Sequence, residues 1–434
     1  MVLVGGTAFA QLLLVIALPF LTRLYSPEDF SALAIYVAVL TMVQVVACLR
    51  LELAVPLPED NVVAANLLAL SLLFVTLISG FTAIFLFFAG TKFLTAIGYL
   101  ELASVSWLLP FGIFLAGSYQ AMQFWSTRHK RFSTIARTRI MQAVIGLSVQ
   151  FGLGVTSVGS IGLNLGHALM VGAGATNLAR QAWRLEREIL VKISRKGMEQ
   201  ALNMYRRFPL YSTWEALANT AANQVPVLLI AAWGVGSEAG FIFLATRVLG
   251  RPVTLIAGSV RQVHMSRASE EMRKGNLASF TTEVLSGLAR VSIAPLVFLA
   301  FIAPPVFALI FGDEWRRAGE LVAWMTPWFI LRSMTLPASN VMHVRMLQPQ
   351  VLTLNTFLLI MVICAMAIAN YTAPRYLAET FALTQAASHF ISLVVFLIAA
   401  GARTEHIKPL IKTVSIFTVL AALLGISARR LLGI

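Results

Sequence analysis

The sequence predicts an all-α polytopic membrane protein with about twelve transmembrane helices in two six-helix lobes. Of its 434 residues, 58% are hydrophobic and only 12% are charged, whereas a soluble protein carries about 25% charged residues. Its apolar runs reach the roughly 20 residues with which a helix crosses a hydrocarbon core. They are continuous, unlike the short alternating strands of a transmembrane barrel. Basic residues also concentrate in every second loop.

Twelve strong apolar segments follow one another along the chain, separated by polar breaks. They lie at residues 3–22, 31–51, 62–90, 104–126, 133–156, 159–181, 210–234, 239–262, 279–311, 319–342, 348–370 and 376–401. The first is interpreted as a span, because it has no basic leader and continues past the signal-like Ala8-Phe9-Ala10. A weaker segment, 411–427, is either a thirteenth span or an interfacial helix.

The distribution of Lys and Arg among the short loops predicts the orientation of the chain. Loops after even-numbered spans are rich in them, as in Arg128-His129-Lys130-Arg131, whereas the alternate loops carry only Arg23, Lys92, Arg316, Arg317 and Arg375. We therefore expect the even loops and the N-terminus in the cytoplasm. This topology also explains the net charge of +14. Nucleic-acid binding is not expected, since the basic segments lack interleaved aromatic residues.

The longest polar segment divides the chain into its predicted domains. These are an N-terminal lobe (1–181), a basic cytoplasmic connector (182–208), a C-terminal lobe (209–402) and a tail (403–434). The lobes echo each other weakly: residues 24–30 resemble 235–240, and Pro19 corresponds to Pro226. Repeated halves with a site at their interface are a common transporter plan. The connector is either an amphipathic helix on the anionic leaflet or a solvated linker.

Four arginines lie inside predicted spans. Arg247 and Arg251 fall in 239–262, Arg332 in 319–342 and Arg290 in 279–311. A charge near the bilayer centre costs about 2.5–3.5 kcal/mol on insertion scales and usually faces protein or a water-filled cavity. Guanidinium groups suit phosphate, so we predict these four as cavity contacts for an anionic substrate. Arginines near span ends are interpreted as reaching the headgroups, namely Arg23, Arg50, Arg137 and Arg139.

A polar stripe marks the segment 210–234, where Glu215, Asn219 and Asn223 recur every four residues. On a helix they share one face. The stripe either lines a cavity, binding sugar hydroxyls or taking part in ion coupling, or makes hydrogen bonds between helices. The sequence favours neither interpretation over the other.

The residue pattern gives no sign of catalysis, a cofactor or a metal site. Cys48 and Cys364 both lie within apolar spans, and the six histidines have no metal-like spacing. No nucleophilic triad, carboxylate pair or Walker motif can be assembled from the loops. We therefore expect a protein that is not an enzyme, driven by an ion gradient or by substrate flux.

Four stretches resemble bacterial polysaccharide flippases of the Wzx type, which belong to the multidrug/oligosaccharidyl-lipid/polysaccharide exporter (MOP) superfamily. They are Gly5–Ala8 with Leu21–Phe30, Leu49–Pro58, Val260–Val263 with Ser266–Ala268, and Ile310–Gly319. The resemblance implies a V-shaped, two-lobed bundle with a cationic central cavity in the bacterial inner membrane. Such proteins carry undecaprenyl-pyrophosphate-linked oligosaccharides to the periplasmic leaflet for lipopolysaccharide (including O-antigen), capsule or exopolysaccharide synthesis. The implied partners are that substrate, membrane lipids, a polysaccharide polymerase and chain-length machinery.

Two other functions are weighed against this one. A multidrug or cation exporter of the same superfamily would need an acidic cavity, but the interior acids are few, chiefly Glu215, Glu283 and Glu379. A membrane polysaccharide polymerase would need a large periplasmic loop, whereas every odd-numbered loop is short.

Overall fold

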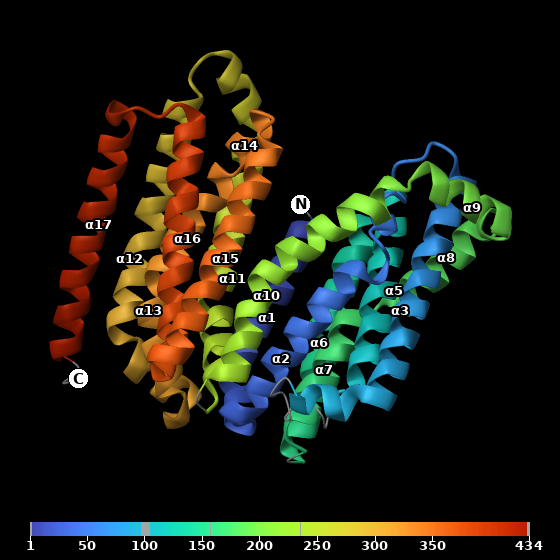
Figure 1. Ribbon diagram of the computed structural model, residues 1–434, viewed down its shortest axis with the longest axis horizontal. Helices are drawn as coiled ribbons and strands as arrows, with labels where there is room; N and C mark the ends of the chain where they lie inside the picture. Colours follow the sequence, from blue (N-terminus) through green and yellow to red (C-terminus); the bar gives the residue numbers. More distant parts are fainter. Residues whose placement is uncertain (1, 97–104, 157, 235, 432–434) are drawn as a thin grey trace. The chain divides into compact units, whose positions relative to one another are not determined.

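The computed structural model describes residues 2–96, 105–156, 158–234 and 236–431, and throughout these residues the regular structure is helical. The chain forms two compact units, Met1–Ala232 and Trp233–Ile434 (Figure 1). The predicted all-α fold is confirmed. Two points of the sequence analysis, residue 104 of the fourth span and residue 235 of the repeat, lie outside the described residues. The finer division at 181, 208 and 402 stays a prediction.

The first unit contains the helices up to α10. Their bounds are α1 Val2–Leu24, α2 Pro27–Ala47, α3 Asn61–Ala96, α5 Leu108–Arg128, α6 Phe132–Val155, α7 Ser160–Gly172, α8 Ala175–Leu190, α9 Arg195–Met204 and α10 Thr213–Trp233. The predicted span 159–181 is two helices, because Gly174 adopts φ +95° between them. That conformation favours glycine, and a Cβ at this position would lie 2.8 Å from Cβ of Thr138.

The second unit contains the remaining helices. They are α11 Glu238–Arg273, α12 Leu277–Phe311, α13 Arg316–Ala338, α14 Asn340–Val344, α15 Gln348–Thr372, α16 Leu377–Ala400 and α17 Thr404–Leu431. Within the described residues, eight helices of the chain are long and apolar enough to cross a membrane. One of them is α17, the helix that contains the weak segment 411–427. Because Leu410 and Ala421 of α17 are buried in the core of this unit, α17 is part of the bundle.

The packing of the two units repeats, as the sequence echo predicts. In the first unit α5 packs against α2, α3 and α7, α2 packs against α3, and α6 packs against α7. In the second unit α13 packs against α11, α12 and α16, α11 packs against α12, and α15 packs against α16. Pro19 lies inside α1 and Pro226 inside α10, while Ser26 and Ser237 precede α2 and α11. The two units therefore share these helix-to-helix contacts.

The basic loops of the first unit meet at one end. Arg128, at the end of α5, donates hydrogen bonds to the loop before α3, including one of 2.6 Å to the carbonyl of Pro58 and one of 2.9 Å to Asn61 Oδ1. Arg131, just before α6, forms an ion pair with the buried Glu186 of α8. Three loops that follow even-numbered spans are thus joined, which agrees with the predicted alternation.

A buried carboxyl group lies in the short 3-10 turn Leu51–Leu53 after α2. Glu52 is 0% exposed, and its Oε1 accepts a hydrogen bond of 2.9 Å from Nε2 of Gln120. The Arg50 guanidinium is 3.8 Å away, and Oε2 of Glu52 has no hydrogen-bond partner among the described residues. Burial is the main cause that raises the pKa of Glu52 above its usual value.

We expect the variant Glu52→Gln to be more stable than the original chain at pH 8 and about equally stable near pH 4.5. The raised folded-state pKa favours the protonated carboxyl group, so its stabilisation is present below the unfolded pKa of about 4.3 and is lost as the pH rises through the folded pKa. Melting temperatures in detergent micelles across this range test the sign. The exposed Glu59 supplies the control Glu59→Gln. If the original chain became more stable than the variant as the pH rises, the raised pKa assigned to Glu52 would be wrong.

The helix α17 lies along α12 at a close glycine contact. A Cβ on Gly425 would be 2.7 Å from Cδ2 and 2.8 Å from Cβ of Phe301. Because Cβ of Phe301 is fixed to the α12 backbone, a rotation of the ring does not relieve this clash. A larger residue at position 425 must therefore move α17 away from α12.

The variant Gly425→Ala is expected to lower the unfolding free energy by about 1–3 kcal/mol, the usual cost of overpacking. Gly287→Ala on α12 is the matched control, since a Cβ there meets nothing within 4 Å. Both changes replace a helical glycine and share the same gain in helix propensity. Thermal unfolding in detergent should therefore separate them, and equal melting temperatures would show that the close contact does not matter.

Candidate functional site: an arginine group on two packed helices

The predicted anion contacts of the second unit lie on two neighbouring helices. Gly250 of α11 faces Phe329 of α13, and a Cβ on Gly250 would be 3.3 Å from the phenyl ring. Arg251 adjoins this contact point, Arg247 lies one turn earlier, and Arg332 follows Phe329 by three residues. The structure therefore brings these three arginines to one packed helix pair.

The depth of the arginines follows from an ion pair near the first residues of α11 and α13. Glu238 and Arg317 are bonded to each other there, so both helices run in the same direction from a common level. At about 1.5 Å per helical residue, Arg251 lies roughly 20 Å and Arg332 roughly 22 Å along them. Both therefore lie near the middle of the predicted spans 239–262 and 319–342.

The surroundings of these guanidinium groups are aromatic rather than acidic. All three side chains are partly buried. The Arg247 guanidinium carbon is 4.5 Å from the ring centroid of Phe243, and that of Arg332 is 5.8 Å from that of Phe329. Such cation–π contacts hold a guanidinium group without cancelling its charge. No salt bridge between described residues involves Arg247, Arg251 or Arg332, so the pair α11–α13 carries uncompensated positive charge.

The fourth predicted arginine stands apart from this group. Arg290 lies on α12, where the neighbouring Leu288 and Ala289 are buried and Arg290 itself is exposed. Among the described residues, no hydrogen bond or ion pair joins it to Arg247, Arg251 or Arg332. The structure brings three of the four predicted anion contacts together, and the role of all four stays a prediction.

The polar stripe belongs to the first unit. Glu215, Asn219 and Asn223 are all exposed on α10, and Nδ2 of Asn223 donates a hydrogen bond of 2.8 Å to the carbonyl of Asn219. Within this unit the stripe is available to a polar ligand. The structure does not decide between the two interpretations of the stripe.

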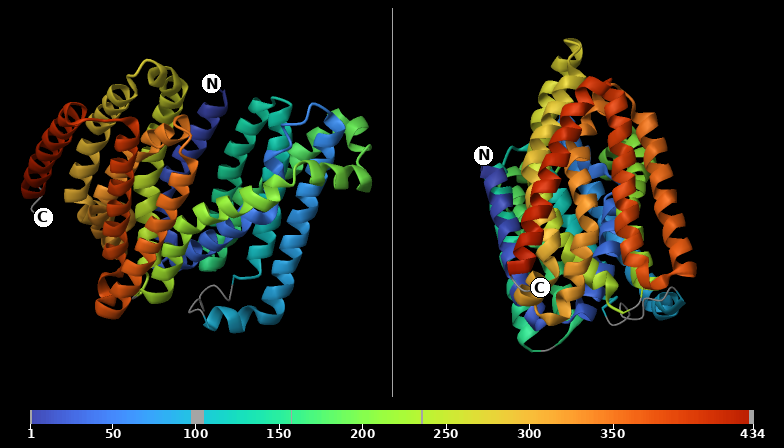
Figure 2. Two further views of the ribbon diagram at one scale, coloured as in Figure 1. Left: turned by 45° about the horizontal axis from the view of Figure 1, so that its top comes forward. Right: turned by 90° about the vertical axis from the view of Figure 1, so that its left-hand side faces the viewer.

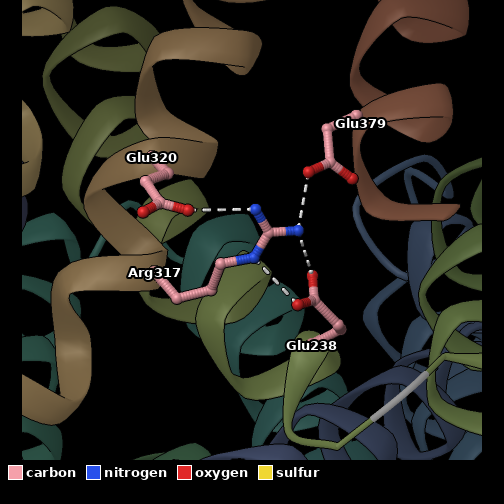
Figure 3. Close-up of polar contacts among 4 residues, drawn as sticks. All are labelled: Glu238, Arg317, Glu320 and Glu379. Carbon is pink, nitrogen blue, oxygen red and sulfur yellow. Dashed lines mark hydrogen bonds and ion pairs between the residues drawn. The ribbon is translucent and has the colours of Figure 1, made fainter. Parts of the chain in front are cut away.

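An arginine network at the start of α11, α13 and α16 is not predicted from the sequence. Nε of Arg317 donates to Oε1 of Glu238 at 2.9 Å, Nη1 to Oε2 of Glu320 at 3.1 Å and Nη2 to Oε1 of Glu379 at 2.6 Å (Figure 3). From the sequence, Arg317 is interpreted as a loop charge and Glu379 as an interior acid. Three helices begin at one end of this unit, so the charged side chains near their first turns lie together. This shared position is the signal from which the network could have been predicted.

This network binds its carboxylates tightly. Glu379 is only 6% exposed, and its second oxygen has no hydrogen-bond partner among the described residues. A single guanidinium thus faces three carboxylates from three helices. The arrangement joins the starts of the three helices.

Comparisons with solved structures identify the fold. The lipid II flippase MurJ, in an inward closed conformation, matches with a TM-score of 0.72 and 15% identity over 97% of this chain and 91% of that chain. An inward-facing multidrug resistance MATE family transporter of the MOP superfamily has a TM-score of 0.69 and 15% identity, covering 91% and 98%. A MOP superfamily transporter from Pyrococcus furiosus has a TM-score of 0.52 and 15% identity, covering 92% and 94%. The chain therefore has this transporter fold and is a multi-pass membrane protein.

Sequence comparison adds the family. No curated protein sequence matches the chain. A family model described as polysaccharide biosynthesis protein matches residues 20–320, which is more than half of the chain. The predicted resemblance is confirmed: the chain belongs to this family of polysaccharide biosynthesis proteins and shares the fold of the MOP superfamily.

Proposed function

We propose that the protein is a flippase that moves an undecaprenyl-pyrophosphate-linked oligosaccharide from the cytoplasmic to the periplasmic leaflet of a bacterial inner membrane. The observation that carries the proposal is the group Arg247, Arg251 and Arg332, three guanidinium groups without a salt bridge among the described residues, on one packed helix pair within two predicted spans. Family membership and the transporter fold support it. The complete glycan then serves the synthesis of lipopolysaccharide, capsule or exopolysaccharide.

The proposed chemistry follows from the part that all such substrates share. A pyrophosphate is a compact anion, and arginine offers it a planar fork of donors that remains charged at physiological pH. Arg247, Arg251 and Arg332 bind this group, with Arg290 as an additional contact, while Glu215, Asn219 and Asn223 bind sugar hydroxyls. Alternating access exposes the cationic cavity first to the cytoplasm and then to the periplasm, where a polymerase and chain-length machinery use the product.

Three features of the chain support this proposal. The basic loops predict, by the positive-inside rule, that the N-terminus and the connector are cytoplasmic. A site that holds an anion without acidic neighbours suits a lipid pyrophosphate better than a cationic drug. The acids Glu238, Glu320 and Glu379 are all bonded to Arg317, which disfavours the multidrug alternative.

The proposal is tested by deleting the gene and locating the lipid-linked sugars. In sealed spheroplasts, a membrane-impermeant periodate reagent oxidises only sugars on the outer leaflet. We expect complete lipid-linked units to accumulate in the protected, cytoplasmic pool, and a plasmid copy of the chain to reverse this. Single units on the outer leaflet would instead indicate a polymerase. Normal surface polysaccharide with increased drug sensitivity would indicate a multidrug exporter.

A further inference from the structure

A cavity lies where α12, α13 and α17 meet at one end of the second unit. Its volume is about 540 Å³, within the range of about 300–1,000 Å³ that is usual for small-molecule sites. Phe301 and Pro304 of α12 contribute apolar surface, Trp324 of α13 adds an aromatic wall, and Arg316 and Arg429 bring charge from α13 and α17. Figure 1 shows that the end of α17 lies at the same end of the unit as the connection from α12 to α13.

Two close helix contacts form the walls of this cavity. A Cβ on Gly319 would be 2.6 Å from the carbonyl oxygen of Ala303, so α13 approaches the α12 backbone directly. Gly425 brings α17 equally close to Phe301. Pro304 and Pro305 follow Ala303 directly on α12 and lack the amide hydrogens of a regular helix. The three helices are thus held together around a space that their side chains do not fill.

The charge of the cavity is positive. Glu320 also lines it, but its carboxylate is bound by Arg317 at 3.1 Å. Two guanidinium groups, those of Arg316 and Arg429, thus line the cavity with one carboxylate, and both arginines are exposed. The Trp324 side chain is 46% exposed beside them. Arginine and tryptophan at the ends of spanning helices are typical of the headgroup layer of a bilayer.

We propose that this cavity binds the phosphate headgroup of an anionic phospholipid. Arg316 and Arg429 bind the phosphate oxygens, and the first part of an acyl chain packs on Phe301, Pro304 and Trp324. The site is separate from the arginine group on α11 and α13, and it binds a bilayer component rather than the transported molecule. A bound lipid bridges α17 to α12 and α13, the helices that form the cavity.

The test uses the delipidated full-length protein in detergent, titrated with dioctanoyl phosphatidylglycerol and followed by native mass spectrometry. Hydrogen bonds to charged groups contribute about 1.5–3 kcal/mol each, so the double variant Arg316→Gln with Arg429→Gln is expected to bind at least about tenfold more weakly. Trp324→Ala should also weaken binding through the lost apolar wall. Arg430→Gln, in the same turn of α17 but not lining the cavity, should leave it unchanged.

Two further ligands separate the possible sources of a lipid phosphate. Dioctanoyl phosphatidylcholine, which is zwitterionic, should bind more weakly than the phosphatidylglycerol. Farnesyl pyrophosphate represents the polyprenyl carrier, and a cavity that bound it but not phosphatidylglycerol would overturn the phospholipid assignment. Equal phosphatidylglycerol binding by the original chain and the double variant would also overturn it. Neither result would touch the proposed flippase activity, which is measured by the leaflet position of the glycan.

Discussion

Replacing both Arg247 and Arg251 with alanine is expected to reduce surface polysaccharide to the level of a deletion strain while the protein remains folded. Each lost charge-assisted hydrogen bond is worth about 1.5–3 kcal/mol, so two together weaken pyrophosphate binding by about 100-fold or more. Both side chains are partly buried and make no salt bridge with a described residue, so their removal leaves no carboxylate without its partner. The effect should therefore fall on transport rather than on folding.

The measurements are surface polysaccharide in cells and transfer of a lipid-linked oligosaccharide across reconstituted vesicles. Arg273→Ala is the matched control, because Arg273 is an exposed residue at the far end of the same helix. Arg247→Lys retains the charge but loses the fork, so it should fall between the original chain and the alanine variant. Unchanged surface polysaccharide in the double alanine variant, at a normal protein level, would rule out the proposed site.

The helical architecture follows from the sequence because its signals are local. Apolar length and alternating loop charge are properties of short windows, and each predicted span corresponds to helix. The break within 159–181 depends instead on Gly174, which has a left-handed conformation and lies so close to Thr138 of α6 that a Cβ would clash there. A window of sequence contains no information about that contact.

The candidate site is predictable only in part, for a related reason. Spacing places Arg247 and Arg251 on one face of α11. The position of Arg332 relative to them depends on the contact between Gly250 and Phe329 of α13. Arg290 has the same sequence signal as the others, a charge within an apolar run, yet it lies exposed on α12. The sequence around Arg290 shows only that burying its charge would be costly. It does not show which residues lie near the side chain.

The network around Arg317 shows the same limit most clearly. Its partners Glu238 and Glu379 are 79 and 62 residues away in the sequence. Each residue by itself looks like an ordinary charge near a helix start. Only the parallel directions of α11, α13 and α16 bring the charges together.

Removal of the central guanidinium is expected to destabilise the second unit strongly. The variant Arg317→Ala leaves Glu238, Glu320 and Glu379 without their common partner, and Glu379 is only 6% exposed. Breaking a buried pair costs about 3–5 kcal/mol, and because the Arg317 side chain is 27% exposed we expect about 3 kcal/mol. Melting of the purified protein in detergent micelles measures the loss.

The origin of that loss can be separated from a simple change of side-chain size. If uncompensated charge is the cause, adding Glu238→Gln and Glu379→Gln to Arg317→Ala should restore much of the stability, because neutral amides cost less to bury than unpaired carboxylates. Glu320 is 47% exposed, so Glu320→Gln alone should change stability by less than about 1 kcal/mol. A triple variant no more stable than Arg317→Ala would show that the guanidinium acts by packing. Restoration would instead show that its charge holds α11, α13 and α16 together where they begin.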